Sequence, residues 1–163
     1  MSEPEPCPEG RFRKDPGGRQ FEDCTECPPG FYCVSGNPTP IECDEGGYCP
    51  QGVQEPIPCP IRTYNPIKGA SSSDGCFACP PGRLCLTSGV GDASPEQYNC
   101  KLNSYCVAGA EEAIPCPLGT YAPGYNTGSV EDCTPCPGGF YCNNNTGSGT
   151  ECRNGTYCPP GSI

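Results

Sequence analysis

The sequence predicts a small, disulfide-rich fold: an elongated tandem array of short irregular β-hairpins and turns with almost no helix. The chain has 18 cysteines among 163 residues, a density typical of secreted disulfide scaffolds. Leu, Ile, Val and Phe together supply only 20 residues, too few for core burial alone to fold the chain. Because 23 prolines and 23 glycines also disfavour long helices, we expect cystine bridges to take the place of a core.

The cysteines recur with one spacing. The numbers of residues between successive cysteines are 16, 2, 5, 9, 5, 9, then 16, 2, 5, 14, 5, 9, then 16, 2, 5, 9, 5. Such regularity is the signature of internal repeats. It predicts three six-cysteine repeats, at residues 1–58, 59–115 and 116–163, with a five-residue insertion within 86–99 of the second.

Aromatic residues and turns keep the same register within each repeat. An aromatic residue lies five positions after the first cysteine (Phe12, Tyr64, Tyr121), and a tyrosine immediately precedes the sixth (Tyr48, Tyr105, Tyr157). We expect these rings to cover disulfide sulfur and form a miniature core; the alternative is an aromatic platform for a ligand. Pro29-Gly30 and Pro81-Gly82 are typical of type II turns, and Gly138-Gly139 takes their place in the third repeat.

The junctions between repeats are short and contain proline. They read "QEPIPCP" and "EEAIPCP", without the Gly/Ser composition of a flexible tether. Such junctions restrict rotation of one repeat against the next. We therefore expect neighbouring repeats to be held in line as a rod.

Three uses of the cysteines need to be weighed. The CxxC pairs resemble zinc half-sites, but the chain has no histidine and six cysteines per repeat do not divide into four-ligand sites. Thioredoxin-like redox chemistry needs a thiol at a helix N-terminus, and no helix is expected. Disulfides remain, three per repeat, and six cysteines allow 15 pairings.

The segment "CPLGTYAPGYNTGSVEDCTPCPGGFYC" resembles the ephrin-receptor-like cysteine-rich repeat, which is itself similar to tumour-necrosis-factor-receptor modules. The resemblance extends over essentially the whole chain and implies an extracellular, β-poor ladder. It also implies that the first cysteine pairs with the second, the third with the fifth and the fourth with the sixth. The implied bonds are Cys7–Cys24, Cys27–Cys43, Cys33–Cys49, Cys59–Cys76, Cys79–Cys100, Cys85–Cys106, Cys116–Cys133, Cys136–Cys152 and Cys142–Cys158.

A local alternative to the last two pairings stays open. The five-residue gap between the third and fourth cysteines departs from receptor modules. In the first repeat the alternative would join Cys27 to Cys33 and Cys43 to Cys49.

The net charge limits which partners can bind the chain, and the cysteine content limits the compartment in which it folds. The formal net charge is −10, so phosphate backbones and anionic lipid surfaces are repelled and we expect no nucleic-acid partner. No apolar run is long enough to enter a membrane, and the first residues lack a signal-peptide pattern. Since disulfides need an oxidising compartment, we interpret the chain as a segment of a larger secreted protein, extracellular or at the cell surface.

Two asparagines lie in N-glycosylation sequons, Asn144 in "NNT" and Asn154 in "NGT", whereas Pro38 blocks the sequon at Asn37. Acidic residues precede the second cysteine of each repeat (Glu22-Asp23, Asp74, Glu131-Asp132). No calcium-binding consensus accompanies them, so we expect solvated turns and no metal.

No catalytic constellation is present, so we expect neither enzyme activity nor a cofactor. The leading hypothesis is a structural segment of an extracellular, glycosylated rod or fibre, whose partners are copies of itself or other extracellular proteins. The alternative is the ligand-binding or adhesion ectodomain of a cell-surface receptor. In that case the insertion "LTSGVGDASPEQYN", Leu86–Asn99, and its Tyr98 would form the specific surface, because only the second repeat carries it.

Overall fold

A computed structural model describes residues 5–15, 17–18, 20–143 and 149–163. Its regular structure consists of two-residue strands and three-residue 3-10 helices, with no α-helix in the described ranges. The strands are β1 (Arg11–Phe12), β2 (Thr25–Glu26), β3 (Phe31–Tyr32), β4 (Ile41–Glu42), β5 (Gly47–Tyr48), β6 (Ile57–Pro58), β7 (Thr63–Tyr64), β8 (Phe77–Ala78), β9 (Ser104–Tyr105), β10 (Ile114–Pro115), β11 (Thr120–Tyr121), β12 (Thr134–Pro135), β13 (Phe140–Tyr141) and β14 (Thr150–Glu151). The 3-10 helices are η1 (Phe21–Asp23), η2 (Ser73–Gly75), η3 (Glu96–Tyr98) and η4 (Val130–Asp132).

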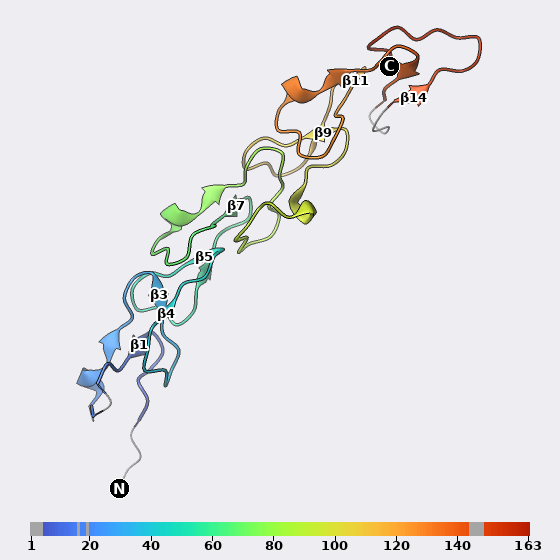
Figure 1. The fold of residues 1–163 in the computed structure, drawn as a ribbon. Helices are drawn as coiled ribbons and strands as arrows, with labels where there is room; N and C mark the ends of the chain where they lie inside the picture. Colours follow the sequence, from blue (N-terminus) through green and yellow to red (C-terminus); the bar gives the residue numbers. More distant parts are fainter. Residues whose placement is uncertain (1–4, 16, 19, 144–148) are drawn as a thin grey trace. The chain divides into compact units, whose positions relative to one another are not determined.

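The strands pair as separate two-stranded sheets. The pairs are β1 with β2, β3 with β4, β5 with β6, β7 with β8, β9 with β10, β11 with β12 and β13 with β14. In the β3–β4 hairpin, which is antiparallel, Phe31 pairs with Glu42 and Tyr32 with Ile41 (Figure 1). This composition confirms the predicted disulfide-rich fold of short hairpins with almost no helix.

Nine disulfides close the fold, and no cysteine is free. The first cysteine of each repeat pairs with the second, as the resemblance implies: Cys7–Cys24, Cys59–Cys76 and Cys116–Cys133. Each of these bonds closes a loop with a sequence separation of 17. The loop carries a 3-10 helix immediately before its second cysteine.

The other six implied pairings are corrected by the structure. Third and fourth cysteines bond to each other, as do fifth and sixth: Cys27–Cys33, Cys43–Cys49, Cys79–Cys85, Cys100–Cys106, Cys136–Cys142 and Cys152–Cys158. They replace the implied Cys27–Cys43, Cys33–Cys49, Cys79–Cys100, Cys85–Cys106, Cys136–Cys152 and Cys142–Cys158.

The reason for the local pairing is the turn between the two cysteines. In the first repeat the backbone reverses over Pro28-Pro29-Gly30 and leaves the Cα atoms of Cys27 and Cys33 at 5.8 Å, a separation that one disulfide spans. The local alternative noted from the sequence is therefore the one that the structure adopts.

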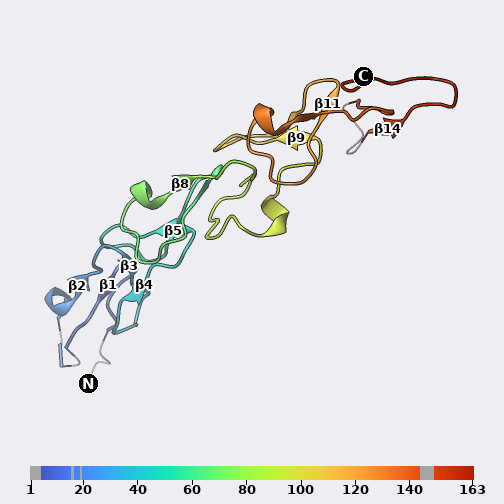
Figure 2. The ribbon, with the colours of Figure 1, turned by 45° about the horizontal axis from the view of Figure 1, so that its top comes forward.

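The chain divides into two compact units. The first comprises Met1–Phe77 with Thr87–Asp92, and the second comprises Ala78–Leu86 with Ala93–Ile163. The boundary falls inside the second sequence repeat, so the compact units and the three repeats are different divisions of the chain. Within the first unit β1 to β4 lie side by side in both ribbon views (Figure 2).

The interior of both units is mostly cystine sulfur. Ten cysteines of the local pairs are completely buried: Cys27, Cys33, Cys43, Cys49, Cys79, Cys85, Cys100, Cys106, Cys136 and Cys142. The second unit adds one small aliphatic cluster, in which Leu84 and Ala110 pack with the Cys100–Cys106 bond. Many larger apolar side chains, Leu118 and Ile61 among them, are exposed, so disulfides do replace a conventional core.

Candidate functional site: a ladder of backbone turns

The structure reveals a smaller repeat than the cysteine spacing suggests. Nine seven-residue turns follow one another, each beginning at a cysteine, and we number them 1 to 9 in chain order: Cys7–Arg13, Cys27–Cys33, Cys43–Cys49, Cys59–Asn65, Cys79–Cys85, Cys100–Cys106, Cys116–Ala122, Cys136–Cys142 and Cys152–Cys158. The fourth residue of every turn has a positive φ, between 60° and 88°: Gly10, Gly30, Gly46, Arg62, Gly82, Asn103, Gly119, Gly139 and Gly155. This left-handed conformation favours glycine and, next, asparagine.

Backbone hydrogen bonds join successive turns within each unit. The Cys43 N–H of turn 3 donates to the Gly30 carbonyl of turn 2 at 2.9 Å, and the Gly30 N–H donates to the Cys49 carbonyl at 2.8 Å. The first of these bonds recurs along the chain, from Cys27 to Gly10, Cys59 to Gly46, Cys100 to Gly82, Cys116 to Asn103, Cys136 to Gly119 and Cys152 to Gly139. Gly30, the fourth residue of its turn, therefore uses both its N–H and its carbonyl to hold the next turn.

A second type of contact joins a turn to the loop that follows the turn after next. A Cβ atom built on Gly46 of turn 3 would lie 2.3 Å from the Gly89 carbonyl oxygen, in the loop that follows turn 5. The same approach occurs at Gly10, Gly30, Gly82 and Gly119, where the Cβ would lie 2.1–2.6 Å from a backbone oxygen. Since such distances are far inside van der Waals contact, glycine is needed at these turns for packing as well as for conformation.

Asn65 is a structural residue that the sequence reading missed. Turn 4 has no second cysteine, and completely buried Asn65 stands at that position. Its Nδ2 donates to the Gly47 carbonyl at 2.7 Å, and its Oδ1 accepts from the Ile67 N–H at 2.9 Å. The side chain thus joins turn 4 to turn 3 from the position at which six of the nine turns carry the second cysteine of a disulfide. The only sequence signal was the absence of a cysteine at that spacing.

The predicted aromatic residues pack along the turns. Phe12, Tyr48, Tyr64, Tyr105 and Tyr121 are half-buried, whereas Tyr157 is 85% exposed. Tyr64 lies against Phe77 with ring centroids 6.3 Å apart. Partial burial of five of the six rings is compatible with the expected role in a miniature core, whereas the exposure of Tyr157 is not.

In the first and third repeats an aspartate just before the second cysteine caps the 3-10 helix. The Asp132 carboxylate accepts hydrogen bonds from the Ser129 N–H at 2.9 Å and from the Ser129 hydroxyl at 3.1 Å. Asp23 accepts from the Gln20 N–H at 3.0 Å in the same way. Their oxygens satisfy backbone donors at the start of a helix. No group of three or more metal-ligating side chains occurs in the part of the chain that the structure describes.

The third residue of every turn is exposed, even where the rest of the turn is covered. Asn154 occupies this position in turn 9 and is itself exposed. A glycan on Asn154 would therefore extend into solvent without disturbing the ladder. The other predicted acceptor, Asn144, lies outside the described residues.

The insertion is built into the ladder. Its residues Thr87–Asp92 belong to the first unit, where Val90 is buried and its carbonyl accepts from the Asn65 N–H at 2.9 Å. The remainder, Ala93–Asn99, contains η3, and half-buried Tyr98 accepts the Leu84 N–H at 2.7 Å through its carbonyl. A surface hollow beside η3 is lined by Glu96, Asn99, Cys100, Lys101 and Tyr125.

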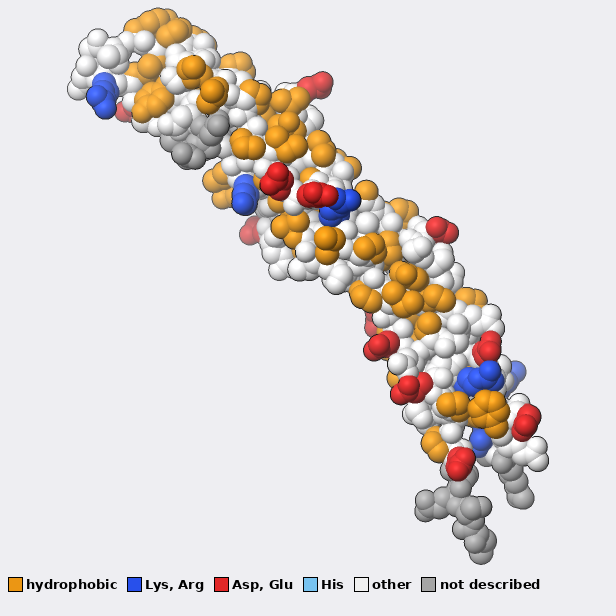
Figure 3. All heavy atoms as spheres, turned by 180° about the vertical axis from the view of Figure 1, so that it is seen from behind, with side chains coloured by type: hydrophobic (Ala, Val, Ile, Leu, Met, Phe, Trp, Pro, Cys, Tyr) orange, Lys and Arg blue, Asp and Glu red, His pale blue; other side chains and the backbone are white. Residues whose placement is uncertain are grey.

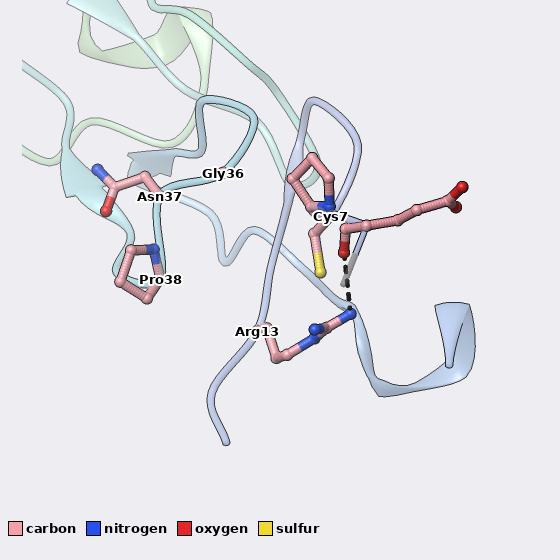
Figure 4. A pocket seen from close by; sticks show the side chains of 7 residues that line it. Cys7, Arg13, Gly36, Asn37 and Pro38 are labelled. Carbon is pink, nitrogen blue, oxygen red and sulfur yellow. Dashed lines mark hydrogen bonds between the residues drawn. The ribbon is translucent and has the colours of Figure 1, made fainter. Parts of the chain in front are cut away.

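A second hollow, of ≈ 230 Å³, lies near the start of the described chain. Cys7, Arg13 and the loop Gly36-Asn37-Pro38 surround it (Figure 4). One Arg13 nitrogen, Nη2, donates to the Glu5 carbonyl at 3.5 Å. The Nε of the same side chain is buried and has no hydrogen-bond partner among the described residues.

On the surface seen in Figure 3, acidic and basic side chains are scattered among hydrophobic side chains, other side chains and backbone. The two ion pairs described, Arg11–Glu26 at 3.0 Å and Lys68–Asp44 at 3.4 Å, are both solvent-exposed. No helix in the described ranges has the length and apolar character needed to cross a membrane.

The features that recur along the chain are thus its backbone turns and its disulfides. The nine disulfides are typical of proteins from an oxidising, extracellular or secretory environment. Neither the protein-family models nor the curated proteins compared with this chain provide a match.

Proposed function

We propose that the chain is a structural segment of an extracellular, glycosylated rod or fibre, in which stacked disulfide turns provide length, stiffness and resistance to proteolysis. The observation that supports this most directly is the ladder itself, because the same backbone bonds recur from turn to turn in both units. Such nearest-neighbour stacking is how solenoid-like repeats build extended structures. The proposal assigns no catalytic role and no cofactor.

The resemblance to ephrin-receptor-like repeats adds to this proposal only at the level of architecture. The bond between first and second cysteines that the resemblance implies is present in this chain, as in Cys7–Cys24. The remaining cysteines pair locally instead of in the implied way. The proposal therefore depends on the turns of this chain and not on the receptor connectivity.

Small-angle scattering and limited proteolysis test the proposal. The oxidised chain, at a concentration where it is monomeric, should scatter as an elongated particle and should resist proteases that cut the reduced chain rapidly. A compact particle, or cleavage as fast as that of the reduced chain, would contradict the proposed function.

A ligand-binding or adhesion role has one observation in its favour. The insertion of the second repeat places η3 beside the hollow lined by Glu96, Lys101 and Tyr125. If this hollow captures a partner, deletion of the five extra residues should abolish capture and leave nine disulfides by mass. If the deletion variant captures the partner as well as the wild-type chain does, the insertion is not the binding surface.

A further inference from the structure

The disulfide between the first and second cysteines of a repeat, which we call the long-loop bond, differs in burial from the local bonds. Five of the six local bonds join two completely buried cysteines. In the second and third repeats the long-loop bond joins a buried cysteine, Cys59 at 0% or Cys116 at 4% exposed, to a half-buried one, Cys76 or Cys133. Because exchange with a thiol begins at one sulfur and depends on access to it, these two bonds are open to attack from one side.

The first repeat has the same bond without the exposure, since Cys7 and Cys24 are both 5% exposed. Arg11 lies beside this bond. Its Nη1 donates to the Cys24 carbonyl at 3.1 Å, and its guanidinium lies 5.3 Å from the centre of the Phe21 ring. Its Nη2 pairs with the Glu26 carboxylate at 3.0 Å. These three contacts fix the guanidinium next to Cys24, where it restricts access to that residue.

The second and third repeats lack this cover. Arg11 is the fifth residue of turn 1, and the fifth residues of turns 4 and 7 are Thr63 and Thr120. Both hydroxyls donate within their own turn, Thr63 to the Pro60 carbonyl at 2.6 Å and Thr120 to the Pro117 carbonyl at 2.7 Å. A difference at one turn position therefore accompanies the difference in burial of the second cysteine.

The half-buried cysteine of the third repeat takes no part in the ladder. Turn 7 is joined to turn 6 by the Cys116 N–H, which donates to the Asn103 carbonyl at 2.8 Å. It is joined to turn 8 by the Cys136 N–H, which donates to the Gly119 carbonyl at 2.8 Å. Neither hydrogen bond uses Cys133, so both can persist when its disulfide opens.

The base of the long loop has a second fastening. In the β11–β12 pair Tyr121 lies opposite Thr134, and the Thr134 hydroxyl donates to the Tyr121 carbonyl at 3.3 Å. The Cys133 N–H donates to the Val130 carbonyl at 3.1 Å, within the segment that contains η4. Opening the disulfide would therefore release the η4 segment and leave turn 7 in place.

We propose that Cys76 and Cys133 are sites of thiol–disulfide exchange with a small external thiol, that exchange there opens the long loop and leaves the ladder intact, and that Arg11 protects the first repeat. The inference is independent of the proposed function, because it depends only on access to individual bonds.

The exchange takes place in two steps. In the third repeat the external thiolate attacks Cys133 Sγ and forms a mixed disulfide, while Cys116 Sγ leaves as a thiolate and takes a proton from water. A second external thiolate then attacks the external sulfur of the mixed disulfide and releases Cys133 as a thiolate, which is also protonated. One protein disulfide is thereby reduced to two thiols, and two external thiols are oxidised to one disulfide.

Brief treatment of the oxidised full chain with mercaptoethanol at neutral pH tests the proposal. The reaction is stopped with acid, free thiols are alkylated in denaturant, and peptides are mapped by mass spectrometry. Because access controls the rate, Cys59–Cys76 and Cys116–Cys133 should open about tenfold faster than Cys7–Cys24. The thiol adduct should be on Cys76 and Cys133. Equal rates for the three long-loop bonds, or adducts on Cys59 and Cys116 instead, would overturn the proposal.

Arg11→Thr tests the protection, because it gives turn 1 the residue found in turns 4 and 7. It should accelerate opening of Cys7–Cys24 by about tenfold, through greater access to the sulfur. Lys14→Thr removes the same charge from an exposed position of the same loop and should leave the rate unchanged. Equal effects of the two variants would overturn the role of Arg11. So would simultaneous opening of Cys27–Cys33, since the variant would then have unfolded the repeat.

Hydrogen exchange tests whether the ladder survives. The double variant Cys116→Ser, Cys133→Ser lacks the long-loop bond of the third repeat. The Cys136 amide, which donates to Gly119, should keep its protection, whereas the Asp132 amide of the η4 segment should exchange faster. Loss of protection at Cys136 would show that the ladder needs this disulfide and would overturn the proposed selective opening.

Discussion

Single residues in this chain matter through the backbone conformation that they allow. The fourth residue of each turn is left-handed, and at Gly46 the neighbouring carbonyl leaves no room for a Cβ atom. Asn103 fits the same backbone because asparagine tolerates positive φ, and Arg62 occupies it at φ 69°, which costs about 1–2 kcal/mol for a residue with a Cβ atom. The cost of the left-handed conformation and the cost of placing a Cβ atom beside that carbonyl can therefore be measured separately by substitution.

Gly46→Ala should destabilise the first unit by more than Gly52→Ala. Both glycines have positive φ, 86° and 76°, so both variants carry the conformational cost of about 1–2 kcal/mol. Only the Gly46 variant adds a collision with a backbone oxygen, at 2.3 Å, and overpacking of this kind costs a further ~1–3 kcal/mol. Thermal unfolding of the oxidised variants measures the difference; equal losses of stability would contradict the packing role of Gly46.

Asn65→Ala should lower the free energy of unfolding by about 1–3 kcal/mol, because it leaves the Gly47 carbonyl without its buried donor. Asn37 provides a matched control, since its Oδ1 also accepts the N–H two residues on, at 3.2 Å, in an exposed setting. Asn37→Ala should have a much smaller effect. Hydrogen exchange of the Ile67 amide, which donates to Asn65, should quicken in the Asn65 variant and not in the control.

At the scale of elements, each hairpin is too short to be stable alone. A two-residue strand pair such as β3–β4 is held by the disulfides on either side of it and by ladder bonds to its neighbours. In the chain-entropy account, closing a loop of 17 residues stabilises by about 3 kcal/mol and a loop of six by about 2 kcal/mol. The local bonds therefore contribute less each, but they fix the turns that form the ladder.

Digestion after glutamate gives a direct check of the connectivity. Cleavage after Glu26 and Glu42 should release a peptide of residues 27–42 whose mass is two hydrogens below its sequence mass, because Cys27 and Cys33 are bonded to each other. If Cys27 were joined to Cys43 and Cys33 to Cys49, the same peptide would stay attached to the following segment until reduction. Finding it attached would contradict the local pairing.

At the scale of the whole molecule, folding should depend on oxidation. Ordering 163 residues costs about 1–2 kcal/mol each for the backbone, which 20 aliphatic and Phe residues cannot offset. Reduction should therefore release 18 thiols and abolish protease resistance, while a metal chelator should change neither. Mass spectrometry of the oxidised, deglycosylated protein should show about 18 hydrogens fewer than the reduced form; free thiols with bound zinc would contradict this account.

The amino-acid sequence by itself determined the class of the fold. Cysteine count and spacing predicted disulfides, repeats and short hairpins, because composition limits what else can stabilise such a chain. Spacing does not specify which cysteines bond to each other. The bond between first and second cysteines, such as Cys7–Cys24, was predicted only from a resemblance to a known repeat, and the partner of Cys27 stayed open.

Only the tertiary structure decided how the turns contact one another. The bonds from Cys43 to Gly30 and the approach of Gly46 to Gly89 join residues whose separation varies with each loop. No fixed sequence period marks those partners. The need for glycine at position 46 became recognisable for the same reason: the Gly89 carbonyl that excludes a Cβ atom there is brought close only by the fold.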